Sequence, residues 1–584
     1  MEQLPQVERA QGARPRRRAG RTDQLTIVAQ DPLIRDRGGE VLTARVRVPG
    51  DRFEDGPRTH RFHVVDYDGG AGTLRPPTRL VAEGRRGVQT LVDQFPGGDP
   101  DLLESEAAFG FHAQNVYAVA ARTLARFERS LGRRLPWAFG GHQLFLVPHA
   151  FAEANAYYAG DDRAIYFGYL PSDGGRSVYT CLSHDIVAHE TTHAVLDGLR
   201  PRFEEPGLPD QAAFHEAFAD IVALLSVLSI REVVERLLGP QDARGRIPEY
   251  RVSEAELMNS ALFGLAEQLG EATLGERGSA LRRSVRLVVS PTVWKTDPAY
   301  NEPHRRGEVL VAAIMQTLLT MWRRRLRPLI HGGGLDRARA AEEGAKSADH
   351  LLGMAVRAID YCPPLEFEFA DFLDAALVSD AELAPDDEHR YRAALTRVFR
   401  QFGIGRPTDP MVDLSSVRRL PRYQSLNFAA LRSDRDEVFR FIWANADRLG
   451  IDRRWYLYVQ DVRPTTRVGP DGMVVNETVA EYVQFLDGTG KELGNLGVTV
   501  PPVCGQVEIR ILGGGVIVFD QFGKAKYHRL KRLDDWDRQS RRLEYLNSNG
   551  LRDGSQRLGF SFGTRRGQRF AEFHAPNSRA GEGW

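Results

Sequence analysis

The stretch Asp185-Ile-Val-Ala-His-Glu-Thr-Thr-His-Ala-Val-Leu196 decides how the rest of the chain is interpreted. The residues around its two histidines are apolar and favour helix, so we expect a buried helix here. On a helix, His189 and His193 lie one turn apart on the same face, so both imidazoles point to one spot. Two converging imidazoles suit a zinc ion, and Glu190 then lies beside the metal as a general base for a zinc-bound water. The alternative is a chance match, because the motif fixes few positions in a long chain.

A second helical stretch supplies a candidate for a third metal ligand. It is Ala213-Phe-His-Glu-Ala-Phe-Ala-Asp-Ile-Val-Ala-Leu-Leu225. A catalytic zinc needs a third protein ligand and an open fourth position, and Glu216 is the candidate for that ligand. Asp220 lies one turn later on the same face, where it can accept the free ring N–H of a zinc-bound histidine. The alternative is a solvated helix face. The apolar residues 221–225 indicate a buried helix, on which two idle carboxylates would be costly.

HETTH followed by HEAFAD resembles the gluzincin metallopeptidases, and within them the thermolysin-like endopeptidases. The resemblance covers about residues 105–404. It implies a zincin core with a small β-sheet lobe, an α-helical lobe and the HExxH helix between them. It also implies zinc ligands, a general base and a supporting carboxylate: His189, His193, Glu216, Glu190 and Asp220. Asp185 also matches an aspartate of that family.

Composition sets broad limits on the kind of protein. Of the 584 residues, 42% are hydrophobic and 27% are charged, which is typical of globular domains, and the length predicts two or three of them. Lys+Arg and Asp+Glu both number 78, so no global charge favours nucleic acid or a membrane as a partner. Cys181, Cys362 and Cys504 lie far apart and predict buried free thiols.

The N-terminus lacks an apolar signal region and the apolar run 219–230 is too short to span a bilayer. We therefore expect a cytoplasmic protein, or one exported without a recognisable signal peptide; the oligomeric state is not indicated.

The pattern along the chain predicts an α+β, multidomain architecture. Residues 1–24 carry a basic run and predict a disordered tail, with a nucleic-acid arm as the alternative. Residues 25–103 contain short β-branched runs and predict an N-terminal β-rich module that caps the catalytic unit. Residues 104–405 form the metallopeptidase-like part, and 406–424 a linker that contains Pro and Arg. Residues 425–584 predict a C-terminal α+β domain of unknown role, with the glycines 513–515 as a hairpin turn between two strands.

Three further segments of the chain match the family more weakly. Asn155 and Ala156 precede two tyrosines, and the resemblance implies an edge strand whose backbone pairs with an extended substrate; a plain edge strand is the alternative. Arg282 matches an arginine that binds a substrate carbonyl, although an ordinary surface arginine is the alternative. His304 opens an apolar helix, where the family places a histidine that stabilises the oxyanion. A helix-capping or merely exposed histidine is the alternative there.

The sequence also departs from the family. The tyrosine that helps to bind the oxyanion is replaced by Phe203 and Glu204, and Tyr157, Tyr158 and Tyr300 are possible substitutes. The acidic cluster that binds paired calcium ions is not visible, so calcium is not carried over despite Asp185.

Two hypotheses follow from the sequence. The first is a zinc endopeptidase that acts on a peptide or protein substrate. The second is a non-catalytic, zinc-containing peptide-binding or scaffolding protein. A retained base and a retained histidine favour the enzyme, because a structural zinc needs neither.

Overall fold

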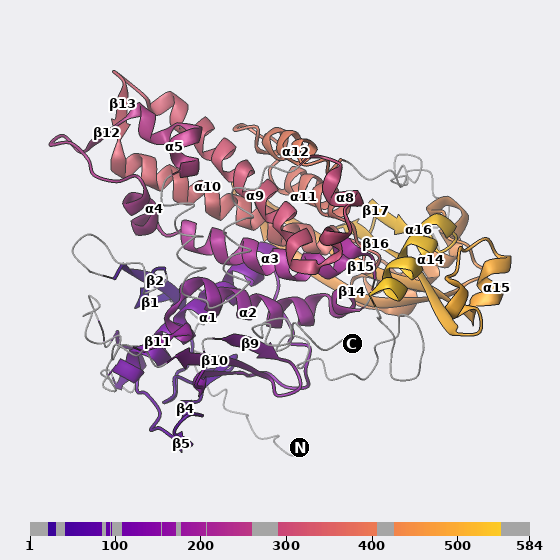
Figure 1. Cartoon of the computed structure of the whole chain (residues 1–584), viewed down its shortest axis with the longest axis horizontal. Coiled ribbons are helices and arrows are strands. Elements are labelled where there is room, and N and C mark those ends of the chain that lie inside the picture. The colour runs from indigo at the N-terminus through magenta and orange to yellow at the C-terminus, as the bar shows by residue number, and fades with distance from the viewer. Residues whose placement is uncertain are drawn as a thin grey trace, which may run out of the picture.

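The chain combines β-rich, helical and mixed parts into a multidomain protein of helices and sheets, which is compatible with the predicted α+β class (Figure 1). The computed structural model describes residues 22–30, 41–83, 89–93, 95, 108–153, 155–170, 177–205, 207–259, 290–405 and 426–549. Most of the predicted N-terminal tail, Arg282 and the predicted linker lie outside the described residues. In Figure 1 the β-rich part lies below, the helices above, and the C-terminal part to one side.

A five-stranded sheet forms the centre of the β-rich part. Its strands are β3 (Phe62–Val64), β8 (Leu144–Phe151), β9 (Ala156–Ala159), β10 (Ala164–Leu170) and β11 (Val178–Tyr179). β8 runs parallel to both β3 and β10, and β9 pairs antiparallel with residues 164–167 of β10. Since β3 belongs to the predicted N-terminal module and β8 to the metallopeptidase-like part, these two regions share one sheet.

Three antiparallel hairpins flank this sheet. They are β1–β2 (Thr22–Val28, Thr43–Pro49), β4–β5 (Tyr67–Asp68, Thr73–Leu74) and β6–β7 (Val81–Glu83, Gln89–Leu91). Ala44, Val46 and Val48 alternate with more exposed residues along β2, so one face of the hairpin is buried. Helix α1 (Phe109–Leu131) is hydrogen-bonded to β1, because the Asn115 side chain accepts a hydrogen bond from the backbone N–H of Val28 at 2.9 Å.

Helices make up the second part. They are α2 (His184–Leu199), α3 (Pro209–Leu228), α4 (Arg231–Leu237), α5 (Glu254–Asn259), α8 (Val293–Thr296), α9 (Pro303–Leu326), α10 (Arg337–Ala358), α11 (Phe369–Leu383) and α12 (Tyr391–Gln401), with the two-stranded antiparallel sheet β12–β13 (Arg246–Pro248, Gly334–Asp336). The apolar helix predicted at His304 is confirmed as α9. Among the described residues one helix, α3, is long and apolar enough to cross a membrane, but most of it is buried in the core.

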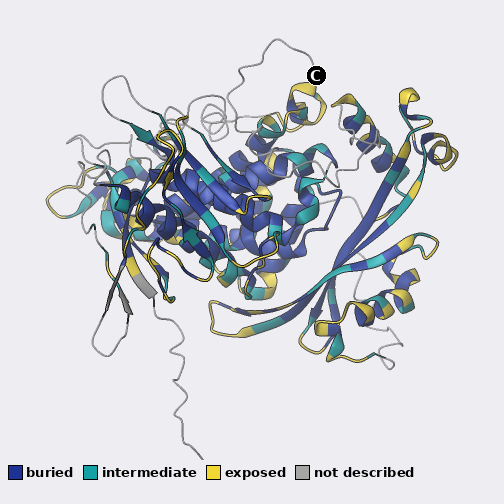
Figure 2. Cartoon of the chain, turned by 90° about the horizontal axis from the view of Figure 1, so that it is seen from below, coloured by how far each residue is buried: buried dark blue, intermediate teal, exposed yellow. Residues whose placement is uncertain are grey.

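The C-terminal part is an antiparallel four-stranded meander with helices around it. The strands are β14 (Tyr456–Val468), β15 (Val474–Thr489), β16 (Glu508–Asp520) and β17 (Ala525–Lys531), and the helices are α14 (Arg435–Leu449), α15 (Gly490–Asn495) and α16 (Trp536–Ser548). β16 and β17 are buried over most of their length, whereas β14 alternates between buried and more exposed residues (Figure 2).

The predicted hairpin turn at residues 513–515 is wrong. The three glycines lie inside β16, paired with β15 and β17. A Cβ on Gly513 would lie 2.7 Å from the backbone nitrogen of Leu533, and one on Gly514 would lie 2.4 Å from the carbonyl oxygen of Tyr482. Glycine is required here because other backbone approaches closely, which a sequence pattern cannot distinguish from a turn.

Buried ion pairs join the C-terminal sheet to the helical part. Glu481 on β15 contacts both Arg200, at the end of α2, and Arg463 on β14. Asp371 on α11 lies 3.0 Å from Arg529 and 2.8 Å from Lys531, both on β17. Apolar residues of the sheet, including Val479, also belong to the main hydrophobic core. The C-terminal part is therefore packed against the helices and is not tethered through residues 406–424 alone.

Candidate metal centre

Two neighbouring helices carry three side chains that can hold a metal ion. His189 and His193 lie on α2, and Glu216 lies on α3, which packs against α2. One ligand atom of each lies within 4.8 Å of the others, and all three residues are buried. Thr191 and Thr192, between the histidines, each donate to the carbonyl four residues earlier, at 2.7 Å. The HETTH stretch can therefore enter the core without leaving its hydroxyls unsatisfied.

Two of the three separations between the ligand atoms match those around a tetrahedral metal ion. The Nε2 atoms of His189 and His193 are 2.8 Å apart, about 0.5 Å closer than tetrahedral ligands would be. Glu216 places Oε2 3.5 Å from His189 Nε2 and Oε1 3.5 Å from His193 Nε2. Zinc bonds of about 2.0–2.2 Å to nitrogen and oxygen put tetrahedral ligand atoms about 3.3–3.5 Å apart. The donor set and its spacing therefore suit a divalent cation.

The outer ring nitrogen of His189 has a carboxylate beside it. His189 Nδ1 lies 2.9 Å from Asp220 Oδ1. The carboxylate is close enough to accept the ring proton, which leaves Nε2 as the ligand atom. The structure thus places Asp220 where the spacing along α3 predicted it.

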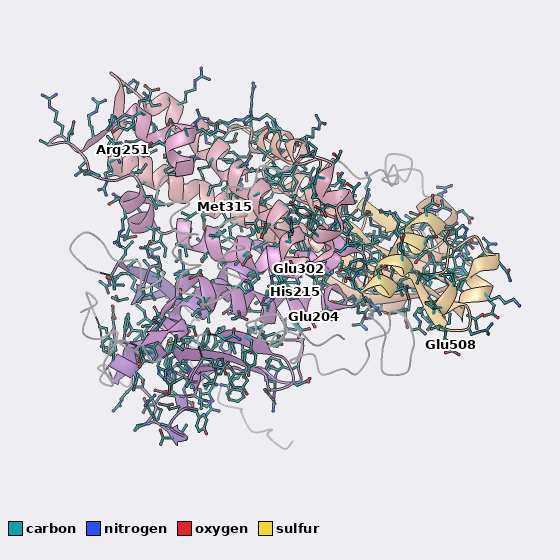
Figure 3. The ribbon with its side chains drawn as sticks, in the orientation of Figure 1. Glu204, His215, Arg251, Glu302, Met315 and Glu508 are labelled. Carbon is teal, nitrogen blue, oxygen red and sulfur yellow. The ribbon has the colours of Figure 1, made fainter. Side chains whose placement is uncertain are left out.

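The outer nitrogen of His193 has a partner that the sequence analysis missed. His193 Nδ1 lies 2.8 Å from His215 Nδ1, and His215 Nε2 lies 3.7 Å from Glu204 Oε1. Burial lowers the pKa of His215 to about 4, against a smaller opposing effect of Glu216. The His215 ring is therefore neutral at pH 7 and can accept the proton of His193. Figure 3 shows His215 and Glu204 close together at this place. The one signal in the sequence was a histidine directly before Glu216 in an otherwise apolar run.

Glu190 faces the edge of the sheet. Its Oε2 accepts a hydrogen bond from the backbone N–H of Tyr158 on β9 at 3.1 Å, and the residue is fully buried. Because backbone groups alternate along a strand, Ala156 presents its N–H and C=O to the same side as Tyr158, away from β10. The Asn155 side chain accepts from the Ala156 N–H at 2.8 Å. Asn155 and Ala156 thus begin the strand whose outer edge faces Glu190.

The tyrosines named as substitutes have other surroundings. The Tyr158 hydroxyl donates to Asp197 Oδ2 at 3.0 Å inside the core. The Tyr157 ring stacks on Phe151, and the guanidinium of Arg305 covers the Tyr300 ring at 4.8 Å.

His304, on α9, lies next to the group formed by His189, His193 and Glu216. Its Nδ1 lies 3.9 Å from Glu216 Oε2, and its side chain is 24% exposed. Glu302, rather than His304, caps α9, because its carboxylate accepts from the N–H groups of His304 and Arg305 at 2.9 and 2.7 Å. Gly307 lets α9 approach α3, since a Cβ there would lie 3.2 Å from the carbonyl oxygen of Ala213.

Two other predicted positions do not add to this group. Asp185 lies in the first turn of α2, where its carboxylate accepts from the Ser183 hydroxyl at 2.7 Å. Arg282 lies outside the described residues.

Comparison of the chain with models of known protein families gives no match, and comparison with curated proteins gives none either.

Proposed function

We propose that the chain is a zinc-dependent endopeptidase of the thermolysin-like, gluzincin type. One observation carries the proposal. His189, His193 and Glu216 converge from two helices while Glu190 faces the outer edge of β9. A structural zinc typically has four protein ligands and needs no carboxylate base, whereas three ligands beside a base are typical of a hydrolytic site.

In this proposal, different residues of the chain have different roles in hydrolysis. Zinc, when bound, would supply an activated water and a Lewis acid for the peptide carbonyl. Glu190 accepts a proton from the attacking water, and the Tyr158 N–H holds one of its oxygens in place. An extended peptide would lie along the outer edge of β9 beside Ala156, as an added strand. His304 is the nearest described imidazole to the ligand group that remains partly exposed, and it would donate to the oxyanion.

The test combines metal analysis with digestion of a peptide library. Wild-type protein should bind zinc and cleave peptides. Glu190→Gln should retain zinc and lose about 10²–10⁴-fold in kcat, since the proton acceptor is removed and the ligands are not. Glu249→Gln, on an exposed carboxylate, is the matched control and should behave as wild type. Zinc-loaded wild type that cleaves no peptide, or full activity in Glu190→Gln, contradicts the proposal.

A further inference from the structure

A second cluster of metal-binding side chains lies outside the centre described above. It consists of His112 on α1, His149 on β8 and Cys181 in the 3₁₀ turn η4 (Thr180–Leu182). Their ligand atoms lie within 4.8 Å of one another, and each residue has an exposed fraction of 0%. Three elements that are distant in sequence therefore bring two imidazoles and a thiol to one buried point.

The two histidines of this cluster repeat the geometry of the first centre. His112 Nδ1 and His149 Nε2 are 2.8 Å apart, the separation found between His189 and His193. His149 Nδ1 lies 2.6 Å from Asp66 Oδ1. The carboxylate accepts the ring proton, so Nε2 of His149 carries a lone pair that points into the cluster.

The thiol is the third donor. Burial, reinforced by the nearby charge of Asp66, raises the pKa of Cys181, so the sulfur holds its proton when no cation is present. A coordinated divalent cation removes that proton outright, because the metal–sulfur bond replaces the S–H bond and the proton leaves to solvent. Arg75 Nη1 lies 3.4 Å from the same Asp66 Oδ1 and 3.3 Å from His149 Nδ1, and Arg75 also binds Asp68. The Asp66 carboxylate, the His149 ring and the Arg75 guanidinium therefore contact one another.

We propose that His112, His149 and Cys181 bind a second zinc ion in a buried site that stabilises the fold. Two imidazole nitrogens and one thiolate are a donor set that zinc prefers. Bonds of about 2.0–2.1 Å to nitrogen and about 2.3 Å to sulfur place tetrahedral ligand atoms about 3.3–3.6 Å apart. All three ligand atoms lie within 4.8 Å of one another, and the 2.8 Å between the two histidine nitrogens would have to widen by about 0.5 Å to reach this spacing.

The place of the site in the fold indicates what it does. Complete burial of the three ligands keeps a peptide substrate away, so the site stabilises rather than catalyses. It links α1 and β8 to η4, which directly precedes α2. A metal here therefore holds the start of the helix that carries His189 and His193, and the β-sheet part, in one arrangement.

The competing explanation is a metal-free chain of hydrogen bonds. His112 Nδ1–H would donate to His149 Nε2, and His149 Nδ1–H would donate to Asp66, with Cys181 as an inert buried thiol. That arrangement satisfies the same polar atoms. It predicts no second metal and no metal–sulfur bond.

Cobalt(II) distinguishes the two explanations. Purified full-length protein is stripped of metal with a chelator and reloaded with Co²⁺. A thiolate ligand gives intense sulfur-to-cobalt charge-transfer absorption in the near ultraviolet, whereas a site of two histidines and a glutamate gives none. We expect this band in wild type, together with about two metal ions per chain.

Variants assign the band to its site. Cys181→Ser should lose the band and retain about one metal ion, while Cys504→Ser, at a buried thiol in the C-terminal part, should keep both. Glu216→Ala should keep the band and lose the other ion, so failure here is distinguishable from failure of the proposed peptidase centre. Wild type without the band, or a band that survives in Cys181→Ser, overturns the proposal. The wild-type spectrum decides the matter even if a variant does not fold.

Discussion

Replacement of Asp220 tests how the candidate centre holds its metal. The Asp220 carboxylate lies 2.9 Å from His189 Nδ1, on the side of the ring that faces away from the ligand atom. It fixes the orientation of the ring and makes Nε2 a better donor. Neither effect requires Asp220 to touch the metal, so the variant changes affinity while all three ligands stay in place.

The magnitude follows from the kind of hydrogen bond that is lost. A bond to a charged group contributes about 1.5–3 kcal/mol and a neutral one about 0.5–1.5 kcal/mol. The Asp220 side chain is 24% exposed, which favours the lower half of the charged range. Asp220→Asn keeps an acceptor oxygen and loses the charge, at a cost of about 1–1.5 kcal/mol, or about 5- to 13-fold in zinc affinity. Asp220→Ala loses both, and should weaken zinc binding by up to about 100-fold.

The assay is competition for zinc against a chromophoric chelator at fixed pH and ionic strength. Turnover per bound zinc and the stability of the metal-free protein are measured in parallel. Asp161→Asn is the control, since this carboxylate lies on the exposed turn between β9 and β10. If Asp220→Ala folds normally and binds zinc as tightly as wild type, Asp220 does not orient His189 and the reasoning is refuted.

Three further predictions concern other parts of the molecule. His304→Ala should keep zinc and lower kcat by about 10²–10³-fold, because an oxyanion donor acts mainly in the transition state; a raised KM with unchanged kcat would instead indicate a role in holding substrate. Glu481→Gln should lower the free energy of unfolding in denaturant by about 3–5 kcal/mol, since buried Arg200 would lose its counter-charge and Arg463 would keep only Asp461 at 3.5 Å; a loss below about 1 kcal/mol would contradict this. Burial lowers the pKa of His528 to about 3, so between about pH 6.5 and pH 3 the unfolded chain binds a proton that the folded chain does not. Stability should therefore fall as pH drops through this window, by up to about 1.4 kcal/mol per unit, and His528→Gln should flatten the slope in thermal unfolding; an unchanged slope would assign it to other groups.

The helix-borne half of the candidate centre could be predicted because it depends on local geometry. The spacing from His189 to His193 and from Glu216 to Asp220 is one helical turn in each case. A helix fixes the relative direction of two such side chains whatever surrounds it. The structure also confirms the apolar helix predicted at His304, which is α9.

The partners that come from elsewhere in the chain could not be predicted. The Tyr158 N–H reaches Glu190 because β9 is placed against α2, and no spacing in the sequence encodes that distance. The glycines within β16 illustrate the same limit, since the backbone that crowds them belongs to β15 and to residues after β17. Glycine occurs both in turns and where two backbone segments approach closely, in each case because it has no Cβ.

The sequence alone thus determined the helix with two histidines, the second helix with two carboxylates, and the order in which they occur. Tertiary structure decided that the two helices face each other, that His215 supports His193, and that the C-terminal sheet is joined to the helices through buried charges such as Glu481. It also brought Cys181 to a pair of histidines that are far away along the chain. The physical reason is that helical periodicity is a property of neighbouring residues, whereas convergence of distant side chains depends on how whole elements pack.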